Sequence, residues 1–308
     1  MASDTPHDHH DHQRHDHQHG HVHIGEAEWA ALAAHAELEA EVLLQFVTDA
    51  VAWAGELRHP NAPPVRTIID IGSGPGVGTC ELARLFPEAH IVAVDGSTAM
   101  LSNARRRAAD HGVSDRIDTH LAELPAGLET IGRADLIWAS MSLHHIGDEV
   151  GVMRMLRDHL EPHGQLVVTE FGDPMRLLPD QVDVGRPGLA ARLDAVAASW
   201  FASMRAGLPG TVPSEEFPTM LGAAGYDVHG SHLARVHLPA PLTPSGRQFA
   251  LTQLQRARAQ FADRLDPDDA EALTVLTDPD HPSSLLHRDG VFVDASRRVM
   301  VASPTEVE

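Results

Sequence analysis

The chain contains only one cysteine and no lysine, and this composition limits its covalent cross-links and its partners. With Cys80 alone no disulfide bond can form within the chain, which favours a cytoplasmic location. All 23 basic side chains are arginines, 44 acidic ones outnumber them, and the net charge is −21. Because such a chain would repel a polyphosphate, we expect no nucleic-acid partner. No apolar run is long enough for a bilayer span and no secretory signal opens the chain, so we expect no membrane partner either.

Residues 1–24 form a low-complexity tail rich in histidine. The tail has almost nothing apolar to bury, so we expect it to be disordered. Histidines at this density bind Zn, Ni or Cu ions, but a segment without fixed geometry is not a catalytic metal site, so metal binding is either incidental or accessory. The candidate ligands are His7, His9, His10, His12, His15, His17, His19, His21 and His23.

The most informative stretch is VRTIIDIGSGPGVGTCE, at residues 65–81. Its aliphatic first part predicts a buried strand, which breaks at Gly72 into a loop with glycine at every second position as far as Gly78. A helical pattern follows directly, and a strand, a glycine turn and a helix make the first unit of a nucleotide-binding α/β sheet. The dinucleotide fingerprint requires Gly or Ala where this chain has Val77, which weighs against an NAD-dependent oxidoreductase.

The pattern D-x-G-x-G-x-G that begins at Asp70 instead resembles motif I of class I S-adenosylmethionine-dependent methyltransferases. The segment D-G-S-T-A-M-L at 95–101 is similar to a family segment whose acid holds the ribose and whose Met packs on adenine; Met100 is therefore either an adenine wall or a core residue. Relatives often place an acid before Ala after the third strand, whereas Glu123 here follows Ala122, so adenine is held either by Glu123 or by backbone groups alone. The resemblance implies cofactor-binding roles for Asp70, Gly72, Ser73, Gly74, Gly76, Asp95, Gly96, Met100, Ala122, Glu123 and Ser140.

The segment S-M-S-L-H-H, which begins at Ser140 after the fourth predicted strand, would face the transferring methyl group in this family. Methyltransferases that act on nucleic-acid amino groups usually carry N/D-P-P-Y/F there, so this segment argues against such substrates. His144 and His145 are the candidate catalytic bases, of which we expect at most one to act, because imidazole titrates near neutrality. A carboxylate acceptor would need no base but an arginine to hold it, and the options are Arg176, Arg186 and Arg205.

The resemblance implies a doubly wound α/β fold with a seven-stranded, mostly parallel, Rossmann-like sheet. A methyltransferase domain (25–308) would follow the tail (1–24). Within it we expect N-terminal cap helices, a core, a helical insertion and a last strand antiparallel to its neighbours, over 26–59, 64–241, 242–289 and 290–302. The cap helices often close over the substrate in this family, which makes Trp29 and His35 pocket candidates. Glu170, at the end of the fifth predicted strand, either serves the pocket or pairs with an arginine.

These patterns predict an enzyme that transfers a methyl group from S-adenosylmethionine to a small-molecule acceptor, at oxygen, nitrogen or a carboxylate. Methyl transfer from a sulfonium is an in-line displacement, so the protein's main task is to align donor and acceptor. The alternative is a non-catalytic protein on the same fold, which senses S-adenosylmethionine or buffers metal through its tail. The sequence leaves the acceptor and the oligomeric state open.

Overall fold

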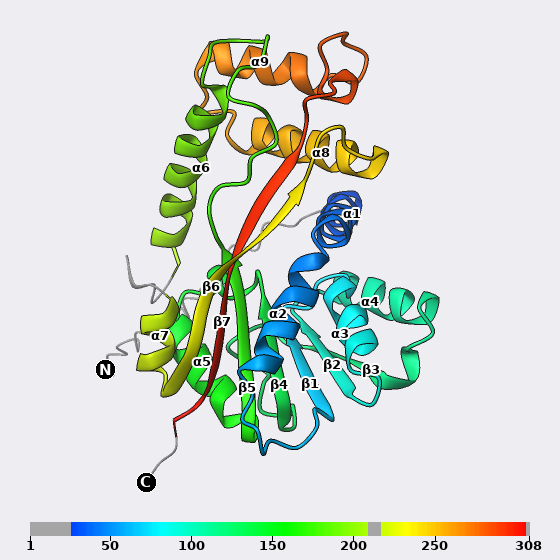
Figure 1. The fold of residues 1–308 in the computed structure, drawn as a ribbon, viewed down its shortest axis with the longest axis vertical. Coiled ribbons are helices and arrows are strands. Elements are labelled where there is room, and N and C mark those ends of the chain that lie inside the picture. Colours follow the sequence, from blue (N-terminus) through cyan, green and yellow to red (C-terminus); the bar gives the residue numbers. More distant parts are fainter. Residues whose placement is uncertain (1–25, 209–216, 306–308) are drawn as a thin grey trace, which may run out of the picture.

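Strand β1 (Thr67–Ile71) is an inner strand of a seven-stranded sheet, paired with β2 and β4, and four of its five residues are buried. In this computed structural model, which describes residues 26–208 and 217–305, the strand order is β3-β2-β1-β4-β5-β7-β6 (Figure 1). Strands β1 to β5 run parallel, and β7 is antiparallel to both β5 and β6. The predicted doubly wound, mostly parallel sheet is confirmed. The strands are β1 (Thr67–Ile71), β2 (His90–Asp95), β3 (Ile117–Leu121), β4 (Ala134–Ser140), β5 (Leu160–Phe171), β6 (Tyr226–Leu238) and β7 (Val293–Pro304).

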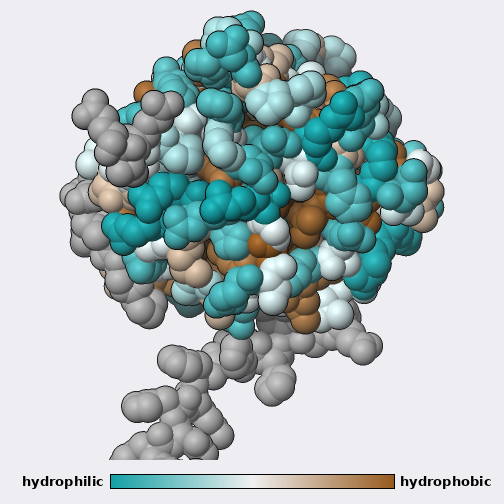
Figure 2. Space-filling view, turned by 90° about the horizontal axis from the view of Figure 1, so that it is seen from below, coloured by the Kyte–Doolittle hydropathy of each residue, from teal (hydrophilic) through white to brown (hydrophobic). Residues whose placement is uncertain are grey.

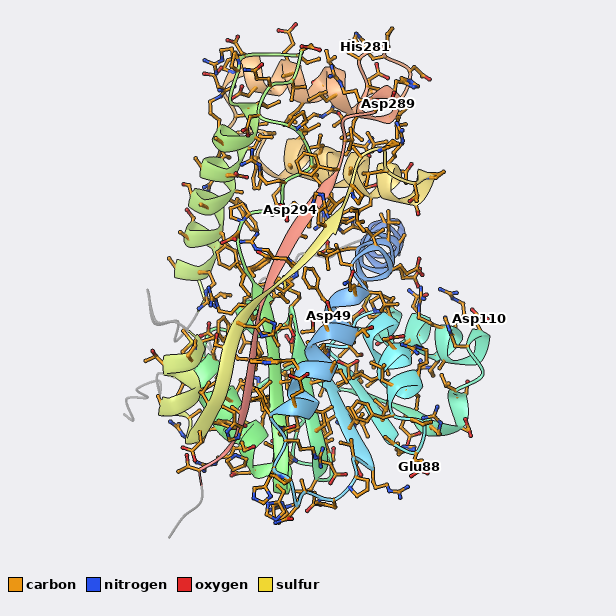
Figure 3. The ribbon with its side chains drawn as sticks, viewed as in Figure 1. Asp49, Glu88, Asp110, His281, Asp289 and Asp294 are labelled. Atoms are coloured by element: carbon orange, nitrogen blue, oxygen red, sulfur yellow. The ribbon has the colours of Figure 1, made fainter. Side chains whose placement is uncertain are left out.

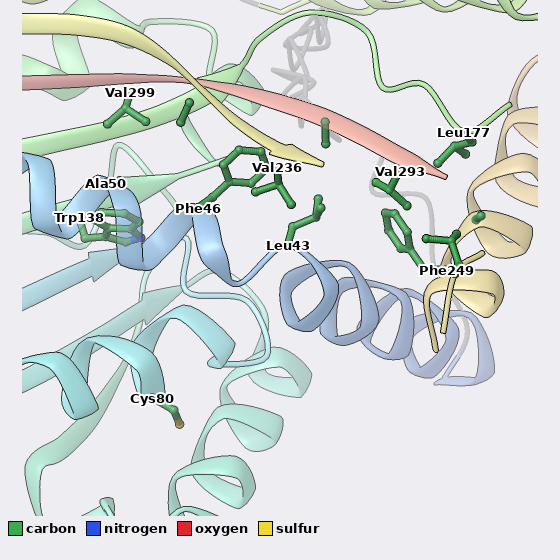
Figure 4. Packing of buried hydrophobic residues seen from close by; sticks show 14 of the residues in the cluster. Leu43, Phe46, Ala50, Cys80, Trp138, Leu177, Val236, Phe249, Val293 and Val299 are labelled. Carbon is green, nitrogen blue, oxygen red and sulfur yellow. The ribbon is translucent and has the colours of Figure 1, made fainter. Parts of the chain in front are cut away.

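Helices cover both faces of the sheet because successive strand residues point to opposite sides. Ile68 packs with α2 and α3 in one hydrophobic cluster, and Ile69 packs with α5 and α7 in the other. Figure 4 shows the first cluster, in which Phe46 of α2 and Trp138 of β4 lie between the helices and the sheet. The helices are α1 (Glu26–Val42), α2 (Gln45–Glu56), α3 (Val77–Leu85), α4 (Thr98–Asp110), α5 (Glu149–Asp158), α6 (Leu189–Ala206), α7 (Phe217–Ala223), α8 (Pro244–Gln260) and α9 (Pro267–Thr277), with short 3-10 turns η1 (Ser114–Arg116), η2 (Leu143–His145) and η3 (Leu285–His287).

Polar side chains fix where several helices begin. Ser97 accepts a hydrogen bond from the Met100 amide at the start of α4, and Asp148 accepts one from the Gly151 amide at the start of α5. Such caps satisfy amide groups that have no partner within the helix. Asp148 is therefore the N-cap of α5.

The segment from Glu161 to Gly164 lies within β5, although it contains proline and glycine, which are typical of a turn. Ala134 of β4 pairs with Leu160, and Leu136 pairs with Gln165, so the extra residues of β5 are accommodated by a shift of register. A side chain at Gly164 would come within 3.0 Å of the Ala134 carbonyl oxygen, which explains a glycine there. The sequence pattern missed this because a bulge and a turn use the same residue types.

Strands β6 and β7 extend beyond the rest of the sheet. The pairing of β5 with β7 ends at Phe171 and Arg297, whereas β6 follows β7 as far as Val293. This two-stranded ribbon carries α8 and α9, which lie above the carboxyl ends of the parallel strands with α6 beside them (Figure 1). Seen from the end opposite to α8 and α9, the surface is mostly hydrophilic, with hydrophobic residues scattered between the hydrophilic ones (Figure 2). None of the helices within 26–208 and 217–305 combines the length and apolar character that a bilayer crossing requires.

Candidate active site

A cavity of about 920 Å³ opens at the carboxyl ends of β1, β4 and β5. The loop after β1 lines one side, and α1, α2, α6 and α8 contribute the other walls. Ligands of open α/β sheets bind in this crevice, and the volume lies near the upper end of the roughly 300–1,000 Å³ typical of ligand sites. The predicted site residues that line the cavity are Asp70, Gly72, Ser73, Gly74, Ser140, His144 and His145; His35, predicted as a pocket candidate, also lines it.

The glycines of the loop after β1 have different reasons to be glycine. All of Gly72, Gly74 and Gly76 have a positive φ, which favours glycine. A side chain at Gly72 would collide with Ser142, and one at Gly76 would lie 2.7 Å from the Cβ of Ala104 in α4. At Gly74 nothing lies within 4 Å, so this position faces open space at the cavity. Gly76 does not line the cavity, and its lack of a side chain permits α3 and α4 to pack closely; its role in shaping the cofactor loop stays a prediction.

Two carboxylates flank the loop at the ends of β1 and β2. Asp70 is 3% exposed, and its Oδ2 accepts a hydrogen bond of 2.6 Å from the hydroxyl of Thr79. Burial raises the pKa of Asp70 to about 7; the Thr79 hydrogen bond opposes this rise and the charge of Asp95 adds to it. Asp95 accepts a hydrogen bond of 2.9 Å from the Gly74 amide and one of 2.8 Å from the Ser97 amide. The glycine loop is thus held against β2 by the side chain predicted to bind ribose.

Six residues predicted to bind the cofactor, among them Asp95 and Met100, do not line the cavity. Four of the six lie together at the ends of β2 and β3: Asp95, Gly96, Ala122 and Glu123. The Ala122 amide donates to the Asp95 carbonyl, at the ends of β3 and β2. Gly96 approaches both Ala122 and the exposed Glu123, and a Cβ at Gly96 would lie 3.7 Å from the Ala122 carbonyl oxygen. Met100 is buried in α4, 8% exposed, which is what its reading as a core residue requires. The contacts of this group with adenine stay predictions, and Gly76 belongs to helix packing as described above.

The histidine pair lies on η2 between β4 and α5. His144 is 5% exposed, and its Nδ1 lies 2.6 Å from the Oε2 of Glu170 on β5. Because a carboxylate only accepts, Nδ1 carries the proton and Nε2 is left as the basic nitrogen. Glu170 also accepts from the Leu143 amide at 3.0 Å, so one buried carboxylate fixes both the turn and the ring. Desolvation and the neighbouring His144 lower the pKa of His145, which keeps its imidazole neutral near pH 7.

An arginine that sequence reasoning missed lies on the cavity wall. Arg297 of β7 is 7% exposed, lies over the rings of Phe46 and Phe171, and forms an ion pair of 2.9 Å with Glu39 of α1. Glu39 also contacts Nε2 of His35 at 3.3 Å. No local signal could have found this network because 258 residues separate Glu39 from Arg297.

The three arginines proposed as anion holders are spread over the molecule. Arg176 lines the cavity and contacts Asp180 at 2.5 Å, whereas Arg186 pairs with Asp266 and Asp268 near α9 and does not line the cavity. Arg205, in the last turn of α6, donates to the His144 carbonyl at 3.1 Å and pairs with the buried Glu149. Glu170 pairs with His144 rather than with an arginine.

The part of the chain that the structure describes contains no group of three or more His, Cys, Asp or Glu side chains placed to hold a metal ion. Figure 3 shows acidic residues such as Glu88, Asp110 and Asp289 far apart on the outside of the molecule. The histidines predicted as metal ligands lie outside the described residues, and so does the side chain of Trp29.

Comparison with known proteins identifies the segment that contains this loop. Residues 68–164 match a family model described as "Methyltransferase domain", which confirms the predicted methyltransferase domain over this segment. A trans-aconitate 2-methyltransferase of Methylobacterium nodulans is 34% identical over 170 residues, 53% of this chain and 62% of that protein. A malonyl-(acyl-carrier protein) O-methyltransferase of Legionella pneumophila subsp. pneumophila is 33% identical over 107 residues, 35% of this chain and 37% of that protein. The chain thus spans less than two thirds of the length of these curated relatives.

Among solved structures, the chain is similar to an S-adenosylmethionine-dependent methyltransferase from Geobacter sulfurreducens in complex with S-adenosyl-L-homocysteine. The identity is 18% and the TM-score 0.44, over 91% of this chain and 92% of that one.

Proposed function

We propose that the methyltransferase domain of this chain transfers a methyl group from S-adenosylmethionine to an oxygen atom of a small molecule. The observation that carries the proposal is the glycine loop held by Asp95, with Gly74 open to a cavity that also contains Asp70 and the histidine pair. S-Adenosylmethionine, when bound, supplies an electrophilic methyl group on a good leaving group.

The polar groups at the loop fit this donor. Asp70 is a buried carboxylate at the cavity, suited to hold the ammonium of the donor's amino-acid end. Asp95 does not line the cavity but holds the Gly74 amide at its edge, and as a partly exposed carboxylate at the end of β2 it is suited to hold the ribose hydroxyls. The hydroxyl of Ser73 is buried and has no hydrogen-bond partner among the described residues, although Ser73 lines the cavity. A buried polar atom without a partner is costly, and a polar ligand group beside it would remove that cost.

The arrangement of His144 favours an oxygen that must lose a proton. The Glu170 carboxylate keeps the proton of His144 on Nδ1, so Nε2 is available to accept the acceptor's proton. Glu170 also stabilises the imidazolium that forms when His144 takes up this proton. The relative from Legionella is named as an O-methyltransferase, which supports oxygen over nitrogen as the acceptor atom.

The test is transfer of isotopically labelled methyl groups from S-adenosylmethionine into a small-metabolite extract of the source cell. We expect a labelled product with the intact protein and none with Asp95→Asn, whose affinity for the donor should fall about tenfold or more because a charge-assisted hydrogen bond is lost. Asp110→Asn, at the exposed end of α4, is the matched control and should label normally.

A donor that binds tightly without any labelled product would overturn the proposal and favour the sensing protein. Calorimetry of donor binding, done on the same preparations, separates this outcome from a protein that does not bind the donor.

We also infer a cytoplasmic location and no nucleic-acid partner from the single cysteine and the net charge of −21. Metal binding by the tail is inferred to be separate from catalysis.

A further inference from the structure

One corner of the cavity is built from aromatic rings of three different elements. Phe171, the last residue of β5, meets the ring of Phe201 on α6 edge to face, with 5.3 Å between the ring centroids. Phe171 also lies 4.6 Å from the imidazole of His144 on η2. The ring of His145 lies 4.0 Å from that of His144, and all four residues line the cavity. The base proposed above therefore belongs to an aromatic cluster, which we call the aromatic corner.

Phe171 is exposed, although a large apolar side chain is usually buried. It is 47% exposed, and in the part of the chain whose burial the structure describes Leu121 is the one other large apolar side chain that is exposed. Apolar side chains that lie together in a concave site, rather than singly on the surface, are typical of a ligand pocket. Because Phe171 lines the cavity beside Phe201, its exposed surface is available to a ligand there.

The arginine beside the aromatic corner already has acidic partners. The guanidinium of Arg297 lies over the ring of Phe171, 5.7 Å from its centroid, and forms an ion pair of 2.9 Å with Glu39. The charge of Glu170, the partner of His144, also acts on Arg297. A carboxylate group of an acceptor would therefore compete with these side chains at the aromatic corner, whereas an uncharged ring would not.

The acidity of the acceptor decides how much an imidazole base can contribute. A carboxylic acid is ionised at neutral pH and needs no base, whereas an aliphatic hydroxyl is about as weak an acid as water, whose pKa is about 15.7. A phenol, with a pKa of about 10, is much closer to the neutral range in which an imidazole titrates. Among oxygen acceptors, a phenol is therefore the best match for the base formed by His144 and Glu170.

We propose that the acceptor is a phenol, whose aromatic ring packs against Phe171 and Phe201 while its hydroxyl lies at Nε2 of His144. The phenolic O–H bond breaks as its proton passes to Nε2, and an electron pair of the oxygen forms the new bond to carbon while the C–S electron pair stays on sulfur. This inference rests on the proposed function and adds the substrate class to it. Phe171 is then a specificity residue, because aromatic pairs attract one another beyond the area that they bury.

The test compares three probes by calorimetry in the presence of S-adenosylhomocysteine, which occupies the donor site without reacting. The probes are 2-naphthol, trans-aconitate and decahydro-2-naphthol, which has the carbon skeleton and hydroxyl of 2-naphthol but no aromatic ring. We expect 2-naphthol to bind more tightly than its saturated counterpart, and trans-aconitate to bind most weakly.

Phe171→Leu keeps an apolar side chain but removes the ring, so it should weaken 2-naphthol about three- to tenfold and decahydro-2-naphthol less than about twofold. Phe171→Tyr keeps the ring and should retain the preference for 2-naphthol, which separates loss of the ring from a disturbed fold. Phe292→Leu is the matched control, since Phe292 lies just before β7 and does not line the cavity.

If Phe171→Leu does not weaken 2-naphthol selectively, or if trans-aconitate binds more tightly than 2-naphthol, the inference is wrong. Labelled methyl transfer to a cell extract is recorded in parallel, so a failure of the enzyme assignment shows up there and not in the probe affinities.

Discussion

Gly74 and Gly76, in the loop after β1, are glycines for different reasons, and single substitutions can separate the effects on donor binding and on stability. Gly76→Ala adds about 1–2 kcal/mol of left-handed strain and places a methyl group against Ala104 of α4, so with the overpacking we expect the unfolding free energy to fall by about 2–5 kcal/mol. Gly74→Ala has free space and costs only about 1–2 kcal/mol of left-handed strain, but its methyl group enters the cavity and should weaken donor binding more than tenfold. Urea unfolding and calorimetric titration of the donor measure the two effects.

The opposite result, donor binding that is more sensitive to Gly76→Ala than to Gly74→Ala, would contradict this division. The sequence predicted the whole glycine motif because its spacing is local. It could not tell the two positions apart, because Ala104 faces Gly76 only after α3 and α4 have packed together.

The buried Asp70 makes donor binding depend on pH. Its pKa is raised to about 7, so the folded protein holds this proton more tightly than the unfolded chain does, and the stability that Asp70 contributes falls as pH rises from about 4 to about 7. An ammonium ligand needs the charged carboxylate, so donor affinity should rise several-fold between about pH 6 and pH 7.5.

Calorimetry at several pH values tests this expectation. Asp70→Asn should bind weakly and with little pH dependence, whereas His145→Gln should keep the wild-type dependence. A wild-type affinity that is flat over this range would show that Asp70 does not hold the ammonium.

Arg205 is a positioning residue for the histidine pair. Its guanidinium bonds the His144 carbonyl and pairs with Glu149, so it ties α6 to η2 and α5. Arg205→Lys keeps the charge for Glu149 but loses the planar fork, so we expect kcat to fall about tenfold while donor Kd is unchanged. If Arg205→Lys lowered thermal stability along with kcat and left the pH profile of kcat unchanged, Arg205 would have a purely structural role.

At the scale of elements, acidic residues fasten helix α1 over the cavity. Glu37 pairs with Arg106 and Glu41 with Arg107, both on α4, and Glu39 pairs with Arg297 of β7. Burial would raise the pKa of Glu39, but His35, Arg297 and Gln253 lower it to about 2. A lowered pKa means stability that is present above about pH 4.5 and is lost as pH falls toward 2.

Glu39→Gln should therefore lower the unfolding free energy at neutral pH by about 3 kcal/mol and flatten its decline below about pH 4.5. Urea unfolding at a series of pH values measures both effects. The matched control is Glu41→Gln on the same helix, where a half-exposed pair should contribute less than about 1 kcal/mol. The same slope in wild type and Glu39→Gln would contradict the pKa assigned to Glu39.

The sequence located most elements, because hydrophobic periodicity and capping residues are local signals. It predicted helices within 26–59, where the structure has α1 and α2, and an antiparallel last strand over 290–302, where the structure has β7. It missed the bulge in β5 and the network of Arg297, because a bulge depends on the neighbouring strand and an ion pair depends on which elements meet. The sheet could be predicted from the family resemblance, whereas the cavity lining became visible only in the structure.

At the scale of the whole molecule, the cavity is lined by residues inside and outside the segment that matches the methyltransferase model. The donor loop lies within the segment that matches the methyltransferase model, residues 68–164. Much of the rest of the cavity is lined by α6 and α8, which follow that segment, and by the N-terminal α1 and α2. The glycine loop proposed to bind the donor could therefore be predicted from a motif, whereas the rest of the cavity depends on packing between distant parts of the chain and could not.

The histidine-rich tail precedes all of these parts, so its removal tests whether metal binding and methyl transfer are separate. We expect a protein that lacks residues 1–24 to keep its donor affinity and turnover, because every described group that lines the cavity belongs to later residues. The same deletion should remove most binding of Zn, Ni or Cu ions, since the described residues contain no cluster that could hold one. Calorimetry with zinc alone and with the donor alone measures both, and a variant with the nine tail histidines replaced by asparagine separates imidazole from chain length. A large loss of donor affinity in either protein would show that the tail is part of the active site.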